Sequence, residues 1–239
     1  ITLINDDPVE KVDRQSKKII TQKGIELEYD ICIFATGSKA FVLPIEGSNL
    51  PSVIGWRTIQ DTEQIIDIAS KKKKAIVIGG GLLGLECARG LLDQGMDVTV
   101  LHLAEWLMEM QLDRKAGDML RADLEKQGMK FELQPNSKRI IGHEDVEAVE
   151  LADGRVIETD LVVMAVGIRP YTEVAKDAGL DVQRGIVVND FLQTSDSNIY
   201  AIGECAEHNG KVYGLVAPLY EQGKVCLLYT SPSPRDGLL

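Results

Sequence analysis

The chain has no closely spaced cysteines and no long apolar run, and these two absences exclude several classes of protein. A redox-active dithiol needs two neighbouring sulfurs, and zinc or iron–sulfur sites need closely grouped ligands. No apolar segment approaches the roughly 20 residues that cross a bilayer, and the first residues do not resemble a signal peptide. We therefore expect core cysteines, no metal site, and a cytoplasmic protein or part of one. The cysteines are Cys32, Cys87, Cys205 and Cys226.

Basic residues are outnumbered by acidic ones. The 239 residues include 26 Lys and Arg against 37 Asp and Glu, which gives a formal net charge of -11. Such a charge repels nucleic acid and anionic membranes, so neither is expected as the main partner. It suits ordinary solubility, and docking of a basic redox protein stays open. With 44% hydrophobic residues, the chain can form one large or two ordinary domains.

A glycine-rich turn lies between a predicted strand and a predicted helix. The apolar run 75–78 leads into Gly79-Gly-Gly81-Leu-Leu-Gly84, and a helix is expected over 82–93, with Gly95 at its end. In a dinucleotide-binding turn the first glycine permits the sharp bend, the second lets pyrophosphate approach the backbone, and the third lets helix and strand pack closely. The flanking strand and helix make this pattern far more specific than the glycines alone. It predicts a nucleotide site at the start of the helix.

Two segments of the chain align without a gap at an offset of 130 residues. Residues 24–37 and 154–167 each contain a turn glycine, a short alternating strand, an acidic residue, an apolar strand and an Ala-x-Gly exit. A continuous apolar strand is typical of a parallel strand covered on both faces. The second copy follows the glycine fingerprint and closes its domain. By analogy the first copy closes another dinucleotide domain, whose own fingerprint this chain lacks.

Further elements follow from periodicity and capping signals. We expect a β-meander over 9–37, a helix over 62–70 capped by Asp61, a strand over 98–101, and a helix from Asp113 to Gly128. The run Lys71 to Lys74 fits a solvated helix end better than an anion site. Residues 229–239 have no periodicity and interrupt a helix expected over 219–228, so we interpret them as a non-native tail.

The motifs occur in the order found in a known family. They are Ala35-Thr-Gly-Ser38, the fingerprint Gly79 to Glu86, Ala165-Val-Gly-Ile-Arg-Pro170, and Thr194 to Glu204. The chain resembles FAD- and NAD(P)H-dependent pyridine nucleotide-disulfide oxidoreductases. Residues 91–108 and 203–218 look most like the large subunit of NAD(P)H nitrite reductases. The resemblance covers residues 1–228 and implies an α/β fold of two Rossmann-like, doubly wound, three-layer dinucleotide-binding domains.

The resemblance also implies how the two domains are divided. An N-terminally truncated and discontinuous FAD domain comprises residues 1–44 and 171–228, and an NAD(P)H domain comprises 45–170. FAD would lie near Ala35, Thr36, Gly37, Gly203, Ala217 and Pro218. Glu204 would accept hydrogen bonds from ribityl or ribose hydroxyls, where most relatives carry Asp. Pro218 would begin a helix directed at the flavin, although a plain helix start is an equal interpretation.

The NAD(P)H side is implied by the same resemblance. The cofactor would contact Gly79, Gly81, Leu82, Leu83, Gly84, His102 and Gly167, and Glu86 would lie beside the nicotinamide as the catalytic residue. Without the family, Glu86 is an ordinary exposed helix residue. His102 occupies the position where an acid binds the ribose of NAD or an Arg accommodates NADP. The absence of a following cation favours NADH, and the choice stays open.

The implied function is electron input. NAD(P)H passes hydride to FAD, and the electrons continue to iron–sulfur and sirohaem centres that reduce nitrite to ammonium. Those metal centres are expected only in the remainder of a longer protein, with this module in cis or with a small redox protein as acceptor. Two alternatives stay open: a stand-alone ferredoxin or rubredoxin reductase, and a dinucleotide-binding sensor without turnover. The oligomeric state is not predicted, and the isolated chain is expected to hold FAD poorly.

Overall fold

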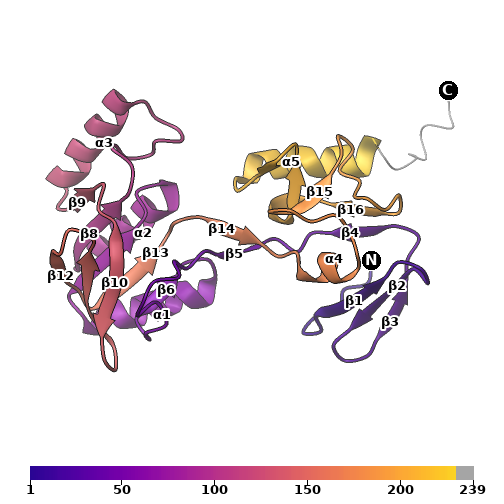
Figure 1. Ribbon diagram of the computed structural model, residues 1–239, viewed down its shortest axis with the longest axis horizontal. Helices are drawn as coiled ribbons and strands as arrows, with labels where there is room; N and C mark the ends of the chain where they lie inside the picture. The colour runs from indigo at the N-terminus through magenta and orange to yellow at the C-terminus, as the bar shows by residue number, and fades with distance from the viewer. Residues whose placement is uncertain (230–239) are drawn as a thin grey trace. The chain divides into compact units, whose positions relative to one another are not determined.

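The computed structural model describes residues 1–229 and divides into two compact units (Figure 1). Unit 1 contains residues 1–39 together with the described residues from 168 onward, and unit 2 contains Ala40–Gly167. The chain passes between them in strands β5 (Ser38–Ala40) and β14 (Ile168–Pro170). Residues 230–239 of the predicted tail lie outside the described part of the chain.

Unit 2 is built on a five-stranded sheet in the order β6-β13-β7-β8-β9. All neighbouring strands in it are parallel. The continuous apolar segments become its central strands, because a parallel strand is covered on both faces. The bounds are β6 Val53–Gly55, β7 Lys74–Ile78, β8 Asp97–His102, β9 Lys130–Leu133 and β13 Leu161–Met164.

Two layers cover this sheet. Helices α1 (Ile59–Lys71), α2 (Leu82–Asp93) and α3 (Arg114–Lys126) pack on the face that carries Val77, Val100 and Val163. The other face, with Ile76 and Leu101, packs against β10 (Ser137–Gly142), β11 (Val146–Leu151) and β12 (Val156–Glu158). The predicted three-layer α/β fold is confirmed. In a doubly wound domain, helices cover both faces of the sheet. In unit 2 the second face is covered instead by the antiparallel sheet β10-β11-β12.

The structure corrects the predicted start of the first helix. Thr58 is the N-cap of α1, and its side chain accepts from the Asp61 amide. The Asp61 carboxylate accepts in return from the Thr58 amide, at 2.6 Å. Asp61 therefore completes a capping box at the third helical position and is not the cap itself. The helix is consequently longer than predicted at its N-terminus.

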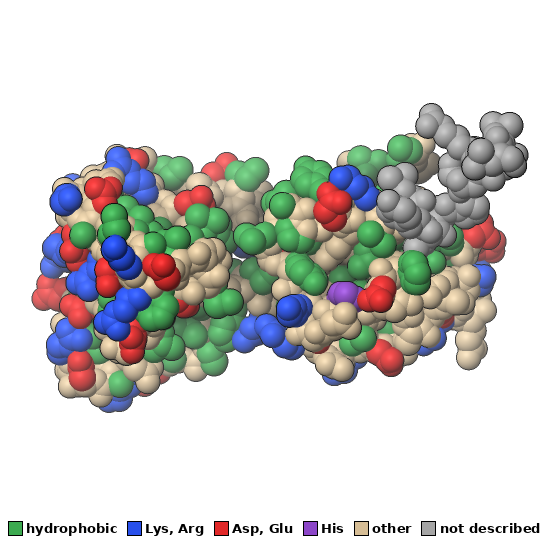
Figure 2. All heavy atoms as spheres, turned by 90° about the horizontal axis from the view of Figure 1, so that it is seen from above, with side chains coloured by type: hydrophobic (Ala, Val, Ile, Leu, Met, Phe, Trp, Pro, Cys, Tyr) green, Lys and Arg blue, Asp and Glu red, His purple; other side chains and the backbone are tan. Residues whose placement is uncertain are grey.

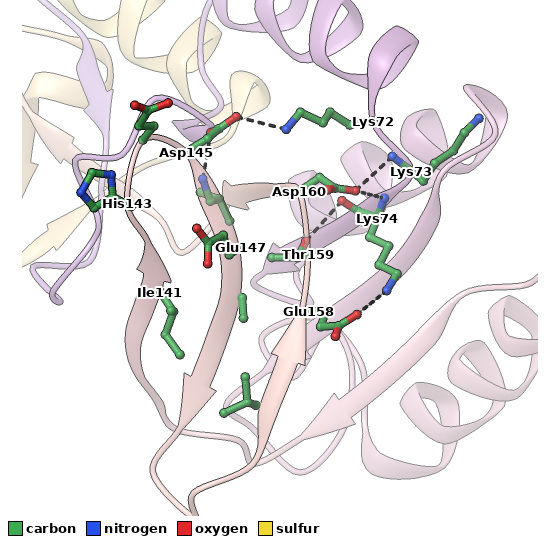
Figure 3. Close-up of a pocket in the computed structure, with 14 residues that line it drawn as sticks. Lys72, Lys73, Lys74, Ile141, His143, Asp145, Glu147, Glu158, Thr159 and Asp160 are labelled. Carbon is green, nitrogen blue, oxygen red and sulfur yellow. Dashed lines mark hydrogen bonds and ion pairs between the residues drawn. The ribbon is translucent and has the colours of Figure 1, made fainter.

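Three lysines of the run Lys71 to Lys74, at the end of α1, pair with carboxylates at the protein surface. Lys71 contacts Asp67 at 2.7 Å, Lys72 contacts Asp145 at 3.2 Å, and Lys74 contacts Glu158 at 2.7 Å. Figure 3 shows the pairs of Lys72 with Asp145 and of Lys74 with Glu158 beside a cavity of about 820 Å³. The cavity lies at the amino end of β7, the opposite edge of the sheet from the glycine turn. These local partners argue against a binding site for a separate anion.

Unit 1 combines small sheets with short helices. The meander β1-β2-β3 (Val9–Asp13, Lys18–Thr21 and Glu26–Glu28) precedes β4 (Cys32–Phe34), which pairs in parallel with β16 (Ile199–Ala201). The remaining elements are α4 (Glu173–Asp177), β15 (Ile186–Val188), a 3₁₀ turn at Gly203–Cys205, β17 (Ala206–His208), β18 (Lys211–Val212), α5 (Val216–Lys224) and a π-helical turn at Val225–Tyr229.

The sequence repeat has a structural counterpart. Each copy contains the last strand of an antiparallel meander, β3 or β12, followed by a parallel strand, β4 in unit 1 and β13 in unit 2. The two copies differ in burial, because β13 is buried throughout while Ile31 and Ile33 are 50% and 39% exposed. The prediction that both strands are covered on both faces is therefore wrong for β4 within the described residues.

The cysteine side chains are buried. All four are free thiols in the interior of their units. Burial raises the pKa of Cys32 to about 11 and that of Cys87 to about 12. Both values are far above neutral pH, so these sulfurs stay protonated and act as small core residues.

The surface carries charges of both signs. On the face of unit 2 shown in Figure 2, Lys and Arg side chains lie among Asp and Glu side chains, without an extended basic patch. That face offers no electrostatic track for a phosphate backbone. Among the described helices, none is both long and apolar enough to pass through a bilayer.

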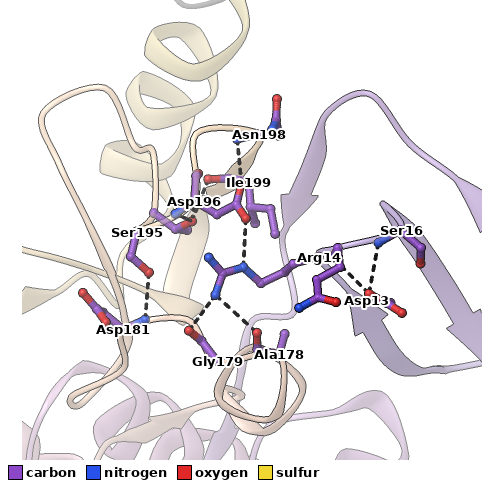
Figure 4. Close-up of polar contacts among 12 residues, drawn as sticks. Asp13, Arg14, Ser16, Ala178, Gly179, Asp181, Ser195, Asp196, Asn198 and Ile199 are labelled. Carbon is purple, nitrogen blue, oxygen red and sulfur yellow. Dashed lines mark hydrogen bonds and ion pairs between the residues drawn. The ribbon is translucent and has the colours of Figure 1, made fainter.

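Arg14 joins the N-terminal meander to the C-terminal part of unit 1 (Figure 4). Its Nε donates to Asp196 Oδ2 at 2.8 Å, and its NH1 group donates to the Gly179 carbonyl at 2.8 Å. The Asn198 amide donates to the other oxygen of the same carboxylate, at 2.9 Å. Together with Arg14, this amide holds the pKa of Asp196 below its ordinary value. Segments 182 residues apart are thus fixed by one guanidinium.

We expect Arg14→Leu to lower the free energy of unfolding of unit 1 by about 1 kcal/mol, because charge-assisted hydrogen bonds at a partly buried site are lost. A carboxyl with a depressed pKa stabilises the fold above its unfolded pKa and loses that contribution as pH falls through its folded pKa. The difference in free energy of unfolding between variant and parent should therefore be largest near neutral pH and should shrink in acid. Urea unfolding across pH measures it, with Lys18→Met, at an exposed ion pair, as the control. An unchanged pH profile would contradict the role given to Arg14.

Candidate functional site

The three glycines of the fingerprint differ in what their surroundings demand. Gly79 has φ +120°, and a Cβ there would lie 2.3 Å from the Ala165 carbonyl oxygen. A Cβ at Gly84 would lie 1.8 Å from the Gly79 carbonyl oxygen. These two positions must be glycine for the turn to form and for α2 to approach β7.

Gly81 is different, because nothing in the protein lies within 4 Å of a Cβ placed there. It is the N-cap of α2 and makes no side-chain capping bond. The first intrahelical bond runs from the Leu85 amide to the Gly81 carbonyl, so the amides of Leu82, Leu83 and Gly84 have no partner within the helix. Open space beside amide donors at a helix N-terminus fits the pyrophosphate of a dinucleotide.

His102, at the end of β8, supports the glycine turn from behind. Its side chain is buried, and Nδ1 accepts from the Gly80 amide at 3.0 Å. A backbone amide only donates, so Nδ1 carries no proton and the ring proton is on Nε2. Nε2 lies 2.9 Å from the Trp106 carbonyl oxygen and 3.0 Å from Glu109 Oε2. The predicted cofactor residue therefore has both ring nitrogens engaged within the protein.

The segment after β8 is fastened to the same glycine turn. The Met108 amide donates to the Gly80 carbonyl at 3.1 Å, and the buried Leu107 side chain would collide with any Cβ at Gly80. Met108 itself has φ +59°, a conformation that costs a non-glycine residue energy and survives only where the surroundings enforce it. Both polar groups of Gly80 are thus held by the 102–108 segment.

These elements enclose a cavity of about 550 Å³ in unit 2. Its walls include four of the predicted contact positions, Gly79, Gly81, Leu82 and His102. Leu83 and Gly84 lie in the first turn of α2, and Gly167 follows the lining residue Val166. Glu86 is an exposed residue of α2 and does not line the cavity. Its proposed place beside a nicotinamide stays a prediction.

Five of the residues predicted to bind FAD follow the carboxyl ends of two paired strands in unit 1. Because β4 and β16 are parallel and pair Phe34 with Ala201, the segments that follow them leave the sheet side by side. One contains Ala35, Thr36 and Gly37, and the other contains Gly203 and Glu204. Carboxyl ends of parallel strands are where open α/β sheets bind ligands.

Neighbouring side chains hold both segments in place. The Ser38 hydroxyl donates to Glu204 Oε2 at 2.8 Å, and the Gly203 amide donates to Gln222 Oε1 on α5 at 2.7 Å. The Thr36 hydroxyl donates to the Tyr171 carbonyl at 2.8 Å. Sequence reasoning missed Ser38 as a partner of Glu204, although it completes the Ala-Thr-Gly-Ser motif. No sequence pattern marked Gln222.

The prediction that Pro218 begins a helix is wrong by two residues. Helix α5 starts at Val216 after the N-cap Leu215, so Ala217 and Pro218 are in its first turn. Pro218 lacks an amide at a position where the amide has no intrahelical partner, and this explains why it is tolerated. Its proposed effect on a flavin stays a prediction.

Glu109 is a further residue that sequence reasoning missed. It lines the cavity of unit 2 and is the only carboxylate among the lining residues, all within the described chain. The sequence does contain this acid, but it lies seven residues after His102, further from the strand end than the positions that were considered.

No group of three or more His, Cys, Asp or Glu among residues 1–229 is arranged to hold a metal ion.

Comparison with protein families gives a match over most of the chain. The model described as "Pyridine nucleotide-disulphide oxidoreductase" matches residues 1–223. The NAD(P)H nitrite reductase of Bacillus subtilis is 52% identical over 237 residues, which cover 97% of this chain and 29% of that protein. The NADH nitrite reductase large subunit of Escherichia coli is 42% identical, over 90% of this chain and 26% of that protein.

A solved structure agrees with these matches. A ferredoxin reductase from Rhodopseudomonas palustris is 30% identical with a TM-score of 0.90, over 97% of this chain and 59% of that one. The chain therefore spans less than a third of the nitrite reductases it matches. It spans somewhat more than half of the ferredoxin reductase.

The glycine geometry gives a test of the binding turn. Gly81→Ala should leave the fold intact, because its Cβ meets nothing, and should weaken NADH binding by roughly tenfold or more, because the methyl group occupies the space of the pyrophosphate. Gly84→Ala should instead destabilise unit 2 by several kcal/mol through backbone overlap.

Both substitutions can be followed by thermal unfolding and by titration of tryptophan fluorescence with NADH. Gly90→Ala is the matched control, since Gly90 is an exposed residue of α2 with open space around it. It should slightly stabilise the helix and leave NADH binding unchanged. Equal NADH affinity in Gly81→Ala and the parent would rule out this turn as the pyrophosphate site.

Proposed function

The chain belongs to the pyridine nucleotide-disulphide oxidoreductase family and is an NAD(P)H-dependent oxidoreductase, and we propose that it is the electron-input module of a nitrite reductase. The observation that carries the proposal is the glycine turn of unit 2, with its open N-terminal amides. The high identity to two nitrite reductases supports the choice of acceptor.

Unit 2 holds the nicotinamide dinucleotide in this proposal. The amides of Leu82 and Leu83, with the helix dipole of α2, bind the pyrophosphate beside Gly81. The remaining predicted contacts, Gly84, His102 and Gly167, shape the turn and the exit of the central strand. Glu86 on the same helix is proposed to orient the nicotinamide ring.

Unit 1 contributes to the flavin site. Glu204, held by Ser38, accepts hydrogen bonds from ribityl or ribose hydroxyls, and the Ala35–Gly37 turn approaches the cofactor through its backbone. The first turn of α5, with Ala217 and Pro218, directs its partial positive charge at the flavin. The bound flavin supplies the chemistry of accepting a hydride and releasing electrons singly. The protein's part is to position the two rings and exclude water.

The acceptor lies beyond this chain. Iron–sulfur and sirohaem centres would be carried by the remainder of a longer protein, as the short coverage of the nitrite reductases suggests. A small redox protein is the second candidate acceptor. It is favoured by the 34% identity to the rubredoxin-NAD(+) reductase of Ectopseudomonas oleovorans and by the fold shared with a ferredoxin reductase.

Anaerobic mixing of NADH with the protein, in the presence of added FAD because the isolated chain is expected to hold it poorly, tests electron input. The flavin absorbance should bleach, and addition of the one-electron acceptor ferricyanide should restore it. Glu86→Gln should slow bleaching while leaving NADH affinity close to that of the parent, because the residue acts on the ring and not on the pyrophosphate. Binding of NADH without any bleaching would instead favour a sensor module without turnover.

A further inference from the structure

We propose that Glu109 is the residue that selects NADH over NADPH, an inference that rests on the proposed dinucleotide site of unit 2. In Rossmann-like domains an acid at the end of the second strand binds the 2′-hydroxyl of the adenosine ribose. Here the strand β8 ends in His102, which has no negative charge. The carboxylate needed at this place comes from Glu109, later in the chain.

The contact between His102 and Glu109 places the carboxylate at the strand end. Glu109 Oε2 is 3.0 Å from Nε2 of His102. Nε2 carries the ring proton, because Nδ1 already accepts from the Gly80 amide. The imidazole accepts from the glycine turn at Nδ1, and its Nε2–H donates to the Trp106 carbonyl at 2.9 Å, with Glu109 Oε2 beside the same nitrogen. One side chain connects the acid to the turn that receives the pyrophosphate.

The backbone before Glu109 is also anchored to the glycine turn. Met108 bonds to the Gly80 carbonyl through its amide, in a left-handed conformation with φ +59°. The Trp106 indole donates to the Leu112 carbonyl at 2.9 Å and closes the same segment. Glu109 thus projects from a segment that is anchored to the glycine turn, while its side chain keeps an exposed fraction of 36%. The second carboxylate oxygen can accept from a ligand hydroxyl.

The charges around the cavity favour the same nucleotide. Among the lining residues, all in the described part of the chain, there is no lysine or arginine to accommodate a 2′-phosphate. Glu109 is the only carboxylate among them. A carboxylate accepts a hydrogen bond from the ribose hydroxyl of NADH and repels the 2′-phosphate of NADPH. One residue therefore both favours NADH and excludes NADPH.

The test compares dissociation constants for NADH and NADPH in this 239-residue chain and its variants, by fluorescence titration. We expect the parent to bind NADH at least about tenfold more tightly than NADPH. Glu109→Gln should bring the two constants within about threefold, mainly through tighter NADPH binding. Glu109→Arg should reverse the preference, because a cation then faces the 2′-phosphate.

Glu105→Gln is the matched control. Glu105 lies on the same segment, is paired with Arg114 at 3.1 Å and does not line the cavity, so the same loss of charge there should leave the ratio unchanged. A ratio that Glu109→Gln does not alter, in a protein that still binds both nucleotides, overturns this inference alone. Failure of the folded parent to bind either nucleotide overturns the proposed function as well.

Discussion

The close approach of α2 to β7 is the constraint on which the candidate site depends. A Cβ at Gly84 would lie 1.8 Å from the Gly79 carbonyl oxygen, so the helix reaches this position only because the side chain is absent. That approach places Gly81 and Leu82, at the start of α2, in the wall of the cavity. The turn is then fixed from the opposite side by His102 and Met108, both of which bond to Gly80. Packing at Gly79 and Gly84 and hydrogen bonding at Gly80 therefore fix the same turn.

Local patterns predicted much of this arrangement. The strand, turn and helix around Gly79 were predictable because glycine positions and apolar periodicity are local properties. The bounds of α2 agree with the prediction, and its Gly95 has the positive φ expected after a helix end. The repeat likewise predicted a short strand and a parallel strand in each copy, which are β3 and β4 in unit 1 and β12 and β13 in unit 2. Such elements are set by residues within a few positions of one another.

Partnerships across the chain were not predictable in the same way. The bond of Ser38 to Glu204 joins residues 166 positions apart, and the Arg14 cluster spans an even longer interval. The role of Asp61 in a capping box, instead of as the cap, depended on a competing cap only three residues earlier. The engagement of both nitrogens of His102 required the segment 103–109 to fold back. Sequence spacing alone does not reveal that this segment folds back onto His102.

Strand β4 has an unpaired edge and a partly exposed apolar face within the described residues. Among the described residues, β4 pairs only with β16. The side chains of Ile31, just before the strand, and of Ile33, within it, are exposed to solvent. A strand with a free hydrogen-bonding edge and apolar neighbours is a template for the addition of strands from other molecules. Self-association through this edge would compete with folding during overexpression. Covering the edge, or placing a lysine at position 33, is therefore the rational first step toward a well-behaved sample.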